Sequence, residues 1–295
     1  MAKRTGDGAP RVVTDPPELR RLLDAERRKG ATVGFVPTMG ALHEGHLALV
    51  RHAREIADLA VVSIFVNPTQ FGPREDLARY PRDLAGDVRL LAPLRTDFVL
   101  APPVEAVYPS GHATTVHVAG LTDGLCGPLR PGHFDGVATV VAKLCSMVGP
   151  CKALFGRKDF QQLQVIRRMA TDLDLPVEVV GRPTVREADG LAMSSRNRYL
   201  SSEQRARAVA LVEGLRSGAT AFAGGERDPA ALERTVRGKL ESRVDRVDYV
   251  FVGDPETLHP YPGPVPEGRT VLAAIAAWIG TTRLIDNAEL GLDRP

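Results

Sequence analysis

The feature that most limits the fold of this chain is an alternation of apolar runs and helical stretches over about the first 180 residues. Largely apolar runs that end near Gly, Asn or Pro cover residues 32–36, 59–66, 97–101, 152–155 and 177–180. Continuous apolar runs are typical of strands that are covered on both faces. Repeated strand–helix–strand units therefore predict an α/β fold with a doubly wound, Rossmann-like parallel sheet and ligands at the carboxyl ends of its strands.

Helical stretches separate these runs. We expect helices over residues 45–58 and 137–148, a helix that ends near 94, and one that begins at Asp159 and continues to about 174. In the second of these helices, one apolar stripe is formed at helical spacing by Val137, Val141, Leu144 and Val148.

The pattern changes near residue 185. Ser201 resembles the N-cap of a helix that continues to Leu215, and a second helix is expected over 229–240. Strands are expected over 247–252 and 270–278. We therefore expect a Rossmann-like domain that binds nucleotide and substrate over residues 1–184, and a smaller α+β domain that acts as a lid over 185–295.

Composition excludes several classes of protein. The 295 residues are 43% hydrophobic and 25% charged, and 38 basic against 36 acidic residues give a net charge of +2. This balance disfavours a dedicated nucleic-acid binder. No run of 18 or more apolar residues is present, so we expect no membrane span. Residues 1–10 lack the apolar core of a signal peptide and are expected to form a frayed tail.

The three cysteines, Cys126, Cys145 and Cys151, are an odd number without CxxC spacing. Free thiols in a reducing cytoplasm fit this pattern best. A catalytic thiol is disfavoured, because Cys145 lies in an apolar helix where it is expected to serve packing.

The turn after the first apolar run carries the densest set of candidate ligands. Residues 37–46 read Pro-Thr-Met-Gly-Ala-Leu-His-Glu-Gly-His and lie between an expected strand and an expected helix. Glycines allow main-chain amides to approach a ligand, and a helix N-terminus supplies partial positive charge. Imidazoles add donors that need not be charged. The turn therefore predicts a site for nucleotide phosphates.

Two other interpretations of His43 and His46 stay open. Metal ligation is disfavoured, because the zinc-protease pattern needs histidines at i and i+4 on one helical face, and these two are three positions apart. A pair of surface histidines in a glycine-rich turn is the plainer alternative. The strand before the turn, the helix after it and further candidate ligands downstream weigh against that alternative.

Three further stretches carry candidate ligands. Lys158 lies between an expected strand and an expected helix, although a solvated charge cluster would have the same composition. Residues 193–197 combine two hydroxyls with a guanidinium, or form no more than a capping loop. Gln70 and Gln162 lie on or just beyond loops at the expected sheet edge, where amides could hold a hydroxy acid, although single glutamines are usually only surface residues.

Five motifs in order resemble the pantothenate synthetase (pantoate–β-alanine ligase) family of the HxGH nucleotidyl-transfer superfamily. They are PTMG…HEGH at 37–46, NPTQF at 67–71, RPGHF at 130–134, KDFQQL at 158–163 and DGLAMSSRN at 189–197. The likeness weakens toward the C-terminus, where it includes RLIDN at 283–287. It implies an ATP-dependent ligase in which pantoate attacks the α-phosphate and β-alanine then attacks the pantoyl adenylate, giving pantothenate, AMP and pyrophosphate.

The resemblance also implies roles for individual residues. His43 occupies the position of the family's proton donor. Phosphate contacts are implied for five further residues, which are His46, Lys158, Ser194, Ser195 and Arg196. The implied ATP site comprises these six residues together with Met39, Gly40, Ala41, Leu42, Glu44, Gly45, Gly156, Arg157, Asp159, Val185 and Met193. The implied substrate-binding residues are Gln70 and Gln162 for pantoate, Gln70 also for β-alanine, and in addition Asn67 and Arg130.

Other implications concern the metal and the assembly. The family's Mg²⁺-associated aspartate falls on Asp87, and the likeness implies a homodimer. The cytoplasmic location expected from the cysteines is compatible with this family. A segment around residues 72–88 is rich in Gly, Pro and charge and is a candidate gate over the substrate.

Three positions depart from the family pattern. Arg157 stands where an acidic residue is usual, Cys126 where Glu is usual, and Asp83 where Thr is usual. Arg157 is expected to point to solvent or to add positive charge near ATP, so nucleotide affinity is in question there. At Cys126 the local loop contacts are in question.

Two rival functions remain on the sequence alone. One is a nucleotidyltransferase of the same superfamily, which would not explain Gln70 together with Gln162. The other is a non-catalytic nucleotide- or RNA-binding module, which the retained His43, His46 and Lys158 and the balanced charge disfavour.

Overall fold

The computed structural model of the chain describes residues 8–73, 75, 77–293 and 295. The chain divides into two compact units. Unit 1 comprises the residues up to Thr122, Cys126–Gly156 and Gln162–Pro183, and unit 2 comprises Asp123–Leu125, Arg157–Gln161 and Thr184–Pro295. The domain boundary expected at residue 184 and the lid role of residues 185–295 stay predictions.

Unit 1 is built on a six-stranded sheet in which every pairing is parallel. Its strands lie in the order β1-β4-β3-β2-β5-β6. Their bounds are β1 Arg11–Val13, β2 Val33–Thr38, β3 Leu59–Ile64, β4 Phe98–Leu100, β5 Cys151–Gly156 and β6 Val177–Arg182. The predicted α/β fold with a doubly wound parallel sheet is confirmed.

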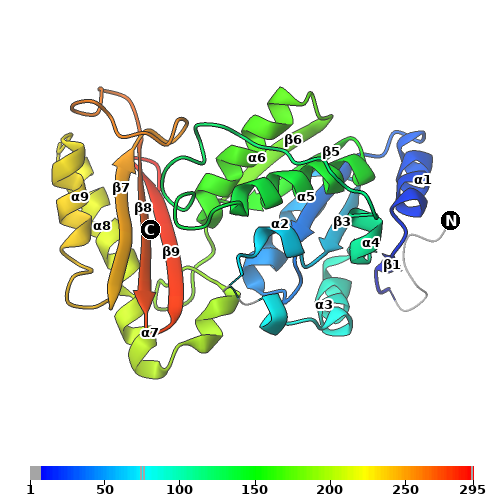
Figure 1. Cartoon of the computed structure of the whole chain (residues 1–295), viewed down its shortest axis with the longest axis horizontal. Helices are drawn as coiled ribbons and strands as arrows, with labels where there is room; N and C mark the ends of the chain where they lie inside the picture. The colour runs from blue at the N-terminus through cyan, green and yellow to red at the C-terminus, as the bar shows by residue number, and fades with distance from the viewer. Residues whose placement is uncertain (1–7, 74, 76, 294) are drawn as a thin grey trace. The chain divides into compact units, whose positions relative to one another are not determined.

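Helices cover both faces of this sheet (Figure 1). One buried cluster joins Val36, Val62, Val99 and Leu154 of the sheet to Leu49 and Val50 of α2 and to Leu91 of α3. Because successive strand residues face opposite sides, Phe35, Val61 and Phe98 face the other layer. The helices assigned to unit 1 are α1 Pro16–Arg27, α2 Glu44–Ile56, η1 Pro68–Gln70, η2 Leu77–Arg79, α3 Leu84–Leu91, η3 Ala92–Leu94, α4 Val104–Val107, α5 His133–Val148 and most of α6 Phe160–Asp172.

The strand order reverses between β2 and β5. The β2–α2–β3 unit steps toward one edge of the sheet, and the β5–α6–β6 unit steps toward the other. Since such crossovers are right-handed, α2 and α6 lie on opposite faces. Folds of this class bind ligands where the strand order reverses, which in this sheet is at the carboxyl ends of β2 and β5. The turn at 39–46 follows β2, η1 follows β3, and Gln162 lies in α6 after β5. The parallel sheet thus brings three predicted stretches to the same edge.

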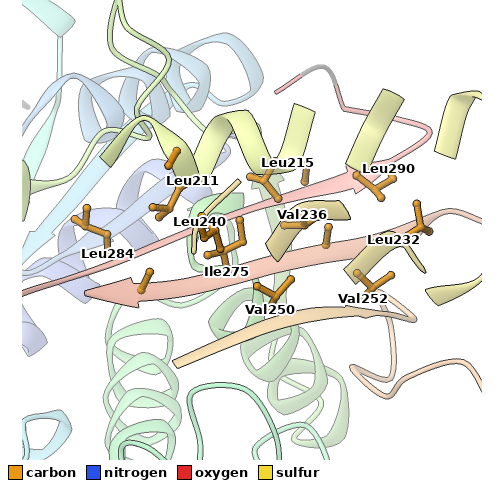
Figure 2. Close-up of a cluster of buried hydrophobic side chains, with 14 of the residues drawn as sticks. Leu211, Leu215, Leu232, Val236, Leu240, Val250, Val252, Ile275, Leu284 and Leu290 are labelled. Atoms are coloured by element: carbon orange, nitrogen blue, oxygen red, sulfur yellow. The ribbon is translucent and has the colours of Figure 1, made fainter. Parts of the chain in front are cut away.

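Unit 2 contains an antiparallel three-stranded sheet in the order β7-β8-β9, with β7 Arg246–Gly253, β8 Val271–Ile279 and β9 Thr282–Leu290. Its core packs α8 and α9 against the sheet through residues such as Leu211, Leu215, Val236 and Ile275 (Figure 2). The helices assigned to this unit are η4 Arg157–Asp159, η5 Ser195–Tyr199, α7 Ser202–Ala208, α8 Ala210–Ala223 and α9 Pro229–Arg237. The predicted smaller α+β domain is confirmed as part of the fold class.

Several local expectations were wrong or incomplete. The single helix expected from Ser201 to Leu215 is two helices, α7 and α8, which meet at Val209, and the second continues to Ala223. The elements β1, α1 and β9 were not predicted. Strand β9 mixes charged and polar residues with apolar ones and was therefore less conspicuous than β8, which is apolar over its full length. Residues 1–7 of the expected frayed tail lie outside the described residues.

Among the described residues, no helix combines the length and apolar character that crossing a membrane requires.

The three cysteines are free, and Cys145 lies inside the buried face of α5 as expected. Burial raises the pKa of both Cys145 and Cys151, to about 12 for Cys151. We therefore expect neither thiol of the folded C126S variant to react with a thiol reagent at pH 8 until the protein is unfolded, because only the thiolate reacts. Rapid labelling of either cysteine in the folded variant would contradict this expectation.

Candidate functional site

The turn at residues 39–46 joins β2 to α2 in a tightly fixed conformation. Gly40 has φ +80° and Ala41 has φ +51°, so two successive residues occupy the left-handed region. The Gly40 N–H donates to Thr38 Oγ1 at 3.2 Å, and Thr38 Oγ1 donates to the Ser63 carbonyl at 2.7 Å. The left-handed conformation is ordinary for glycine and unfavourable for alanine. Outside contacts are therefore needed to hold the turn.

Two histidines begin α2 and form a reciprocal cap. His43 is the N-cap, and its Nδ1 accepts the N–H of Gly45 at 3.2 Å. His46 Nδ1 accepts the N–H of His43 at 3.4 Å. The ring centroids are 4.1 Å apart. A main-chain N–H can only donate, so both Nδ1 atoms are unprotonated, and a neutral ring then carries its proton on Nε2. In this tautomer each ring has an Nε2–H donor, which suits contact with phosphate.

Asp87 of α3 is buried at 4% exposure and accepts main-chain N–H groups with both oxygens. Oδ2 accepts from Ala41 at 3.0 Å and Oδ1 from Leu42 at 2.8 Å. Burial raises the pKa of Asp87, and the two N–H donors act in the opposite direction. Asp83, which departs from the family pattern, is the N-cap of α3 and accepts from Gly86 N at 2.8 Å. Asp and Thr both cap helices, so this departure leaves the local structure intact.

A single buried amide orients the side chain of Gln70. Asn67 is 1% exposed, and its Nδ2 donates to Gln70 Oε1 at 3.0 Å and to the Gly136 carbonyl at 3.1 Å. Its Oδ1 accepts from Thr69 Oγ1 at 3.0 Å and from the Tyr108 hydroxyl at 2.8 Å. Since Oε1 is engaged by a donor, the remaining Nε2 of Gln70 is presented as a hydrogen-bond donor. A donor is what a carboxylate or hydroxyl oxygen of a hydroxy acid requires.

Arg130 is tied to the segment that follows Gln70. Its guanidinium forms a two-point ion pair with Glu75 at 2.7 and 2.6 Å, and its Nη1 lies 2.9 Å from His133 Nε2. His133 Nδ1 lies 2.9 Å from the Gln70 carbonyl. Although partial burial acts to raise it, the pKa of Glu75 is lowered because Arg130 bonds to the carboxylate and attracts it. Arg130 therefore positions the Gln70 segment, and direct substrate contact by Arg130 stays a prediction.

Helix α5 packs directly onto this segment at Gly136. A Cβ at Gly136 would lie 2.5 Å from the Thr69 carbonyl oxygen and 2.8 Å from Gln70 Cα, both main-chain atoms. We therefore expect Gly136→Ala to displace η1 and to raise the KM for the acid substrate about tenfold, a loss of about 1.4 kcal/mol. The matched control is Gly124→Ala, where a Cβ meets no atom within 4 Å. A normal KM for Gly136→Ala would show that η1 does not position the substrate.

In unit 2, the turn that carries Lys158 is anchored by its neighbours. Asn287 of β9 donates through Nδ2 to the carbonyls of Arg157 and Lys158, at 3.0 and 2.7 Å. Arg157 forms ion pairs with Glu289 and, at 3.1 Å, with Asp293. The Arg157 guanidinium is therefore paired with two carboxylates and does not point freely to solvent. The other expectation, added positive charge near ATP, stays a prediction. A contact of residue 157 with ATP stays a prediction.

Two other predicted ATP residues are brought together by a hairpin. The Met193 N–H donates to the Val185 carbonyl at 2.9 Å, and Gly190, with φ +90°, lies in the turn between them. Ser194 then begins η5, where its hydroxyl accepts from Arg196 N at 3.3 Å.

The hairpin is secured by polar residues that the sequence analysis did not single out. Arg186 pairs with the buried Asp286 at 2.7 and 3.1 Å, while Arg205 of α7 contacts Glu187 at 2.7 Å and Asp189 at 2.9 Å. Burial raises the pKa of Asp286, and its pairing with Arg186 acts in the opposite direction. Two motifs from the sequence analysis contain some of these supports: RLIDN at 283–287 contains Asp286, and DGLAMSSRN at 189–197 begins with Asp189.

The structure thus presents the predicted residues in two sets, each within one unit. Unit 1 contains residues 39–46, Asn67, Gln70, Asp87, Arg130, Gly156 and Gln162, the last half-buried near the start of α6. Unit 2 contains residues 157–159, Val185 and residues 193–196. Within the described part of the chain, no group of three or more His, Cys, Asp or Glu side chains is arranged to hold a metal ion.

The parallel sheet, with a Gly- and His-containing turn at its switch point, places the chain in the Rossmann-like α/β class. A family model described as pantoate-beta-alanine ligase matches residues 11–289. The chain therefore belongs to the pantoate–β-alanine ligase family, and the predicted ligase class is confirmed.

Individual relatives agree with this assignment. A pantothenate synthetase of Moorella thermoacetica is 52% identical, covering 92% of this chain and 95% of its own length. Pantothenate synthetase 1 of Bradyrhizobium diazoefficiens is 53% identical, covering 95% and 98%. Among solved structures, a pantothenate synthetase of Thermus thermophilus has a TM-score of 0.88 at 49% identity, covering 95% and 99%. The Francisella tularensis ligase, complexed with beta-gamma ATP and beta-alanine, has a TM-score of 0.78 at 31% identity, covering 96% and 98%.

Proposed function

We propose that this ligase joins (R)-pantoate to β-alanine through a pantoyl-adenylate intermediate, with ATP as the second substrate. The product, pantothenate, would enter the synthesis of coenzyme A. The observation that carries the proposal is the orientation of Gln70, whose amide donor is fixed by Asn67 beside a turn that displays two Nε2–H donors from the same sheet edge. The Gln70 amide suits a small hydroxy acid, and the two imidazoles suit phosphates.

In the first step, a pantoate carboxylate oxygen bonds to the α-phosphorus of ATP and the bond to the β-phosphate oxygen breaks. The carboxylate is already ionised near neutral pH, so the step needs no strong base. The obstacle is the approach of an anion to a polyanion. We assign its relief to His43, His46, Lys158, Ser194, Ser195 and Arg196, which would stabilise the charge growing on the departing pyrophosphate.

Gln70 and Gln162 would hold pantoate, and residues 39–46, 156–159, 185 and 193–196 would hold ATP. In the second step the amine of β-alanine bonds to the acyl carbon, AMP leaves with the bridging oxygen, and the amine loses a proton. The adenylate is already activated, so holding the amine beside it supplies most of what this step needs.

Some finer points belong to the same proposal. Mg²⁺ would enter with ATP on its phosphates, since the described residues assemble no metal-binding group of their own. The enzyme would act as a homodimer in the cytoplasm, with the smaller domain as a lid. The proposed gate spans residues 72–88, of which 74 and 76 lie outside the described residues.

The experiment supplies ATP, pantoate and β-alanine and follows nucleotide products. AMP should form only when both organic substrates are present. AMP formation that ignores either substrate would overturn the assignment, ADP would indicate kinase chemistry, and a stable dinucleotide-like product would indicate a nucleotidyltransferase.

A further inference from the structure

We propose that Asp87 is a positioning residue for ATP, which fixes the turn at 39–46 by accepting its main-chain N–H groups, and that it is not a ligand of Mg²⁺. This inference rests on the proposed function, because it concerns the same nucleotide site. It differs from the role that the family resemblance suggested for Asp87, and it is argued from the contacts of the carboxylate.

Both carboxylate oxygens of Asp87 already accept hydrogen bonds from main-chain N–H groups. Oδ2 accepts from Ala41 N and Oδ1 from Leu42 N, at 3.0 and 2.8 Å. At 4% exposure, Asp87 has almost no surface through which a hydrated ion could approach. Magnesium demands near-ideal octahedral geometry and usually retains several waters. A buried carboxylate with both oxygens on the main chain does not fit that requirement.

The conformation of the turn at 39–46 depends on the Asp87 carboxylate. In the turn at Gly40 and Ala41, the consecutive N–H groups of Ala41 and Leu42 both point to the Asp87 carboxylate of α3. Successive main-chain N–H groups of a turn can bind an anion in this way. A Cβ at Gly40 would lie 2.8 Å from Asp87 Oδ2, so the carboxylate lies directly against the main chain. The protein thus supplies its own anion to hold the turn.

The contacts of Asp87 also affect the position of His43 and His46. Leu42, whose N–H is held by Asp87, directly precedes His43, the N-cap of α2. Loss of the carboxylate would release Ala41 from its unfavourable conformation and let the start of α2 move. The Nε2–H donors of His43 and His46 would then lose their alignment. Asp87 therefore acts on ATP through the histidines and without touching it.

The test separates nucleotide binding from metal binding. In Asp87→Asn, one amide oxygen can accept one N–H, but the amide NH₂ opposes the other. We expect Asp87→Asn to bind ATP at least tenfold more weakly by calorimetry in EDTA, with the same fold-change in Mg²⁺ and an unchanged Mg²⁺ activation constant. The control is Asp15→Asn, the same change at the N-cap of α1, which retains its cap and should bind ATP within twofold of wild type.

Unchanged affinity for metal-free ATP in Asp87→Asn, or a raised Mg²⁺ requirement, would overturn the proposal. Two measurements cover the case in which this variant fails to fold. The double variant D87N/A41G should recover folding and part of the affinity, because glycine adopts the left-handed conformation without the carboxylate. Nucleotide-free wild type titrated with Mn²⁺ should show no stoichiometric site by electron paramagnetic resonance, and such a site would contradict the proposal. The dependence of AMP formation on both substrates tests the proposed function separately.

Discussion

Lys158→Ala should lower the rate of pantoyl-adenylate formation by about 10²–10³, equivalent to about 3–4 kcal/mol, because a donor aimed at developing charge is lost. The ammonium is proposed to meet the triphosphate, and the turn that carries it is held by Asn287 through two carbonyls. The substitution removes the charge and leaves those main-chain contacts in place. The measurement is single-turnover pyrophosphate release with pantoate and ATP, without β-alanine.

The matched control is Lys239→Ala, an exposed lysine in the same unit, which should react like wild type. The second step supplies a further control. When synthetic pantoyl adenylate is given directly, Lys158→Ala should form pantothenate within a few-fold of wild type. If Lys158→Ala released pyrophosphate at the wild-type rate, the role assigned to this lysine would be wrong.

His46→Ala should depress the same step by a similar factor, about 10²–10³. Alanine removes two things together: the proposed Nε2–H donor, and the Nδ1 that accepts the His43 N–H. Asparagine separates them, because its Oδ1 occupies roughly the place of Nδ1 and retains the cap. We therefore expect His46→Asn to retain the thermal stability of wild type while losing as much activity as His46→Ala.

The control for both variants is His259→Ala, an exposed histidine in unit 2. Wild-type adenylate formation by His46→Asn would mean that the histidine serves the helix cap alone. Loss of activity only in His46→Ala, together with lower thermal stability, would point to the same conclusion.

The sequence predicted five of the six strands of the parallel sheet and the edge at which the candidate ligands lie. The apolar runs before residues 37, 67 and 156 predicted three strands whose carboxyl ends carry candidate ligands, and β2, β3 and β5 lie side by side in the sheet. These strands could be predicted because they are buried on both faces and their apolar character is continuous. Five ordered motifs then sufficed for the family, which the matching model and relatives confirm.

The residues that hold the candidate site in place could not be predicted from the sequence in the same way. Asn287 lies about 130 positions from the turn that it holds, and Asp286 lies 100 positions from its partner Arg186. Such pairings follow from tertiary packing and leave no local periodicity. The same holds for Asp87, because nothing in its own helix shows that two N–H groups from residues 41 and 42 meet its carboxylate.

For Arg157, the sequence predicted the position in the candidate site but not the partners of the side chain. Its charge suggested either solvent exposure or a contribution to ATP binding, and the structure pairs it with Glu289 and Asp293. A charged residue in a turn has several possible partners, and the sequence does not say which of them the fold brings near. The two carboxylates lie on and just beyond β9, a strand that was itself not predicted.

The most direct test of the account follows one oxygen atom. The protein is incubated with ATP, β-alanine and pantoate that carries ¹⁸O in its carboxylate, and the AMP is analysed by mass spectrometry. A pantoyl-adenylate route leaves one pantoate oxygen bridging carbon and phosphorus, so the AMP should carry a single ¹⁸O in its phosphate. AMP without ¹⁸O, formed while pantothenate accumulates, would contradict the account.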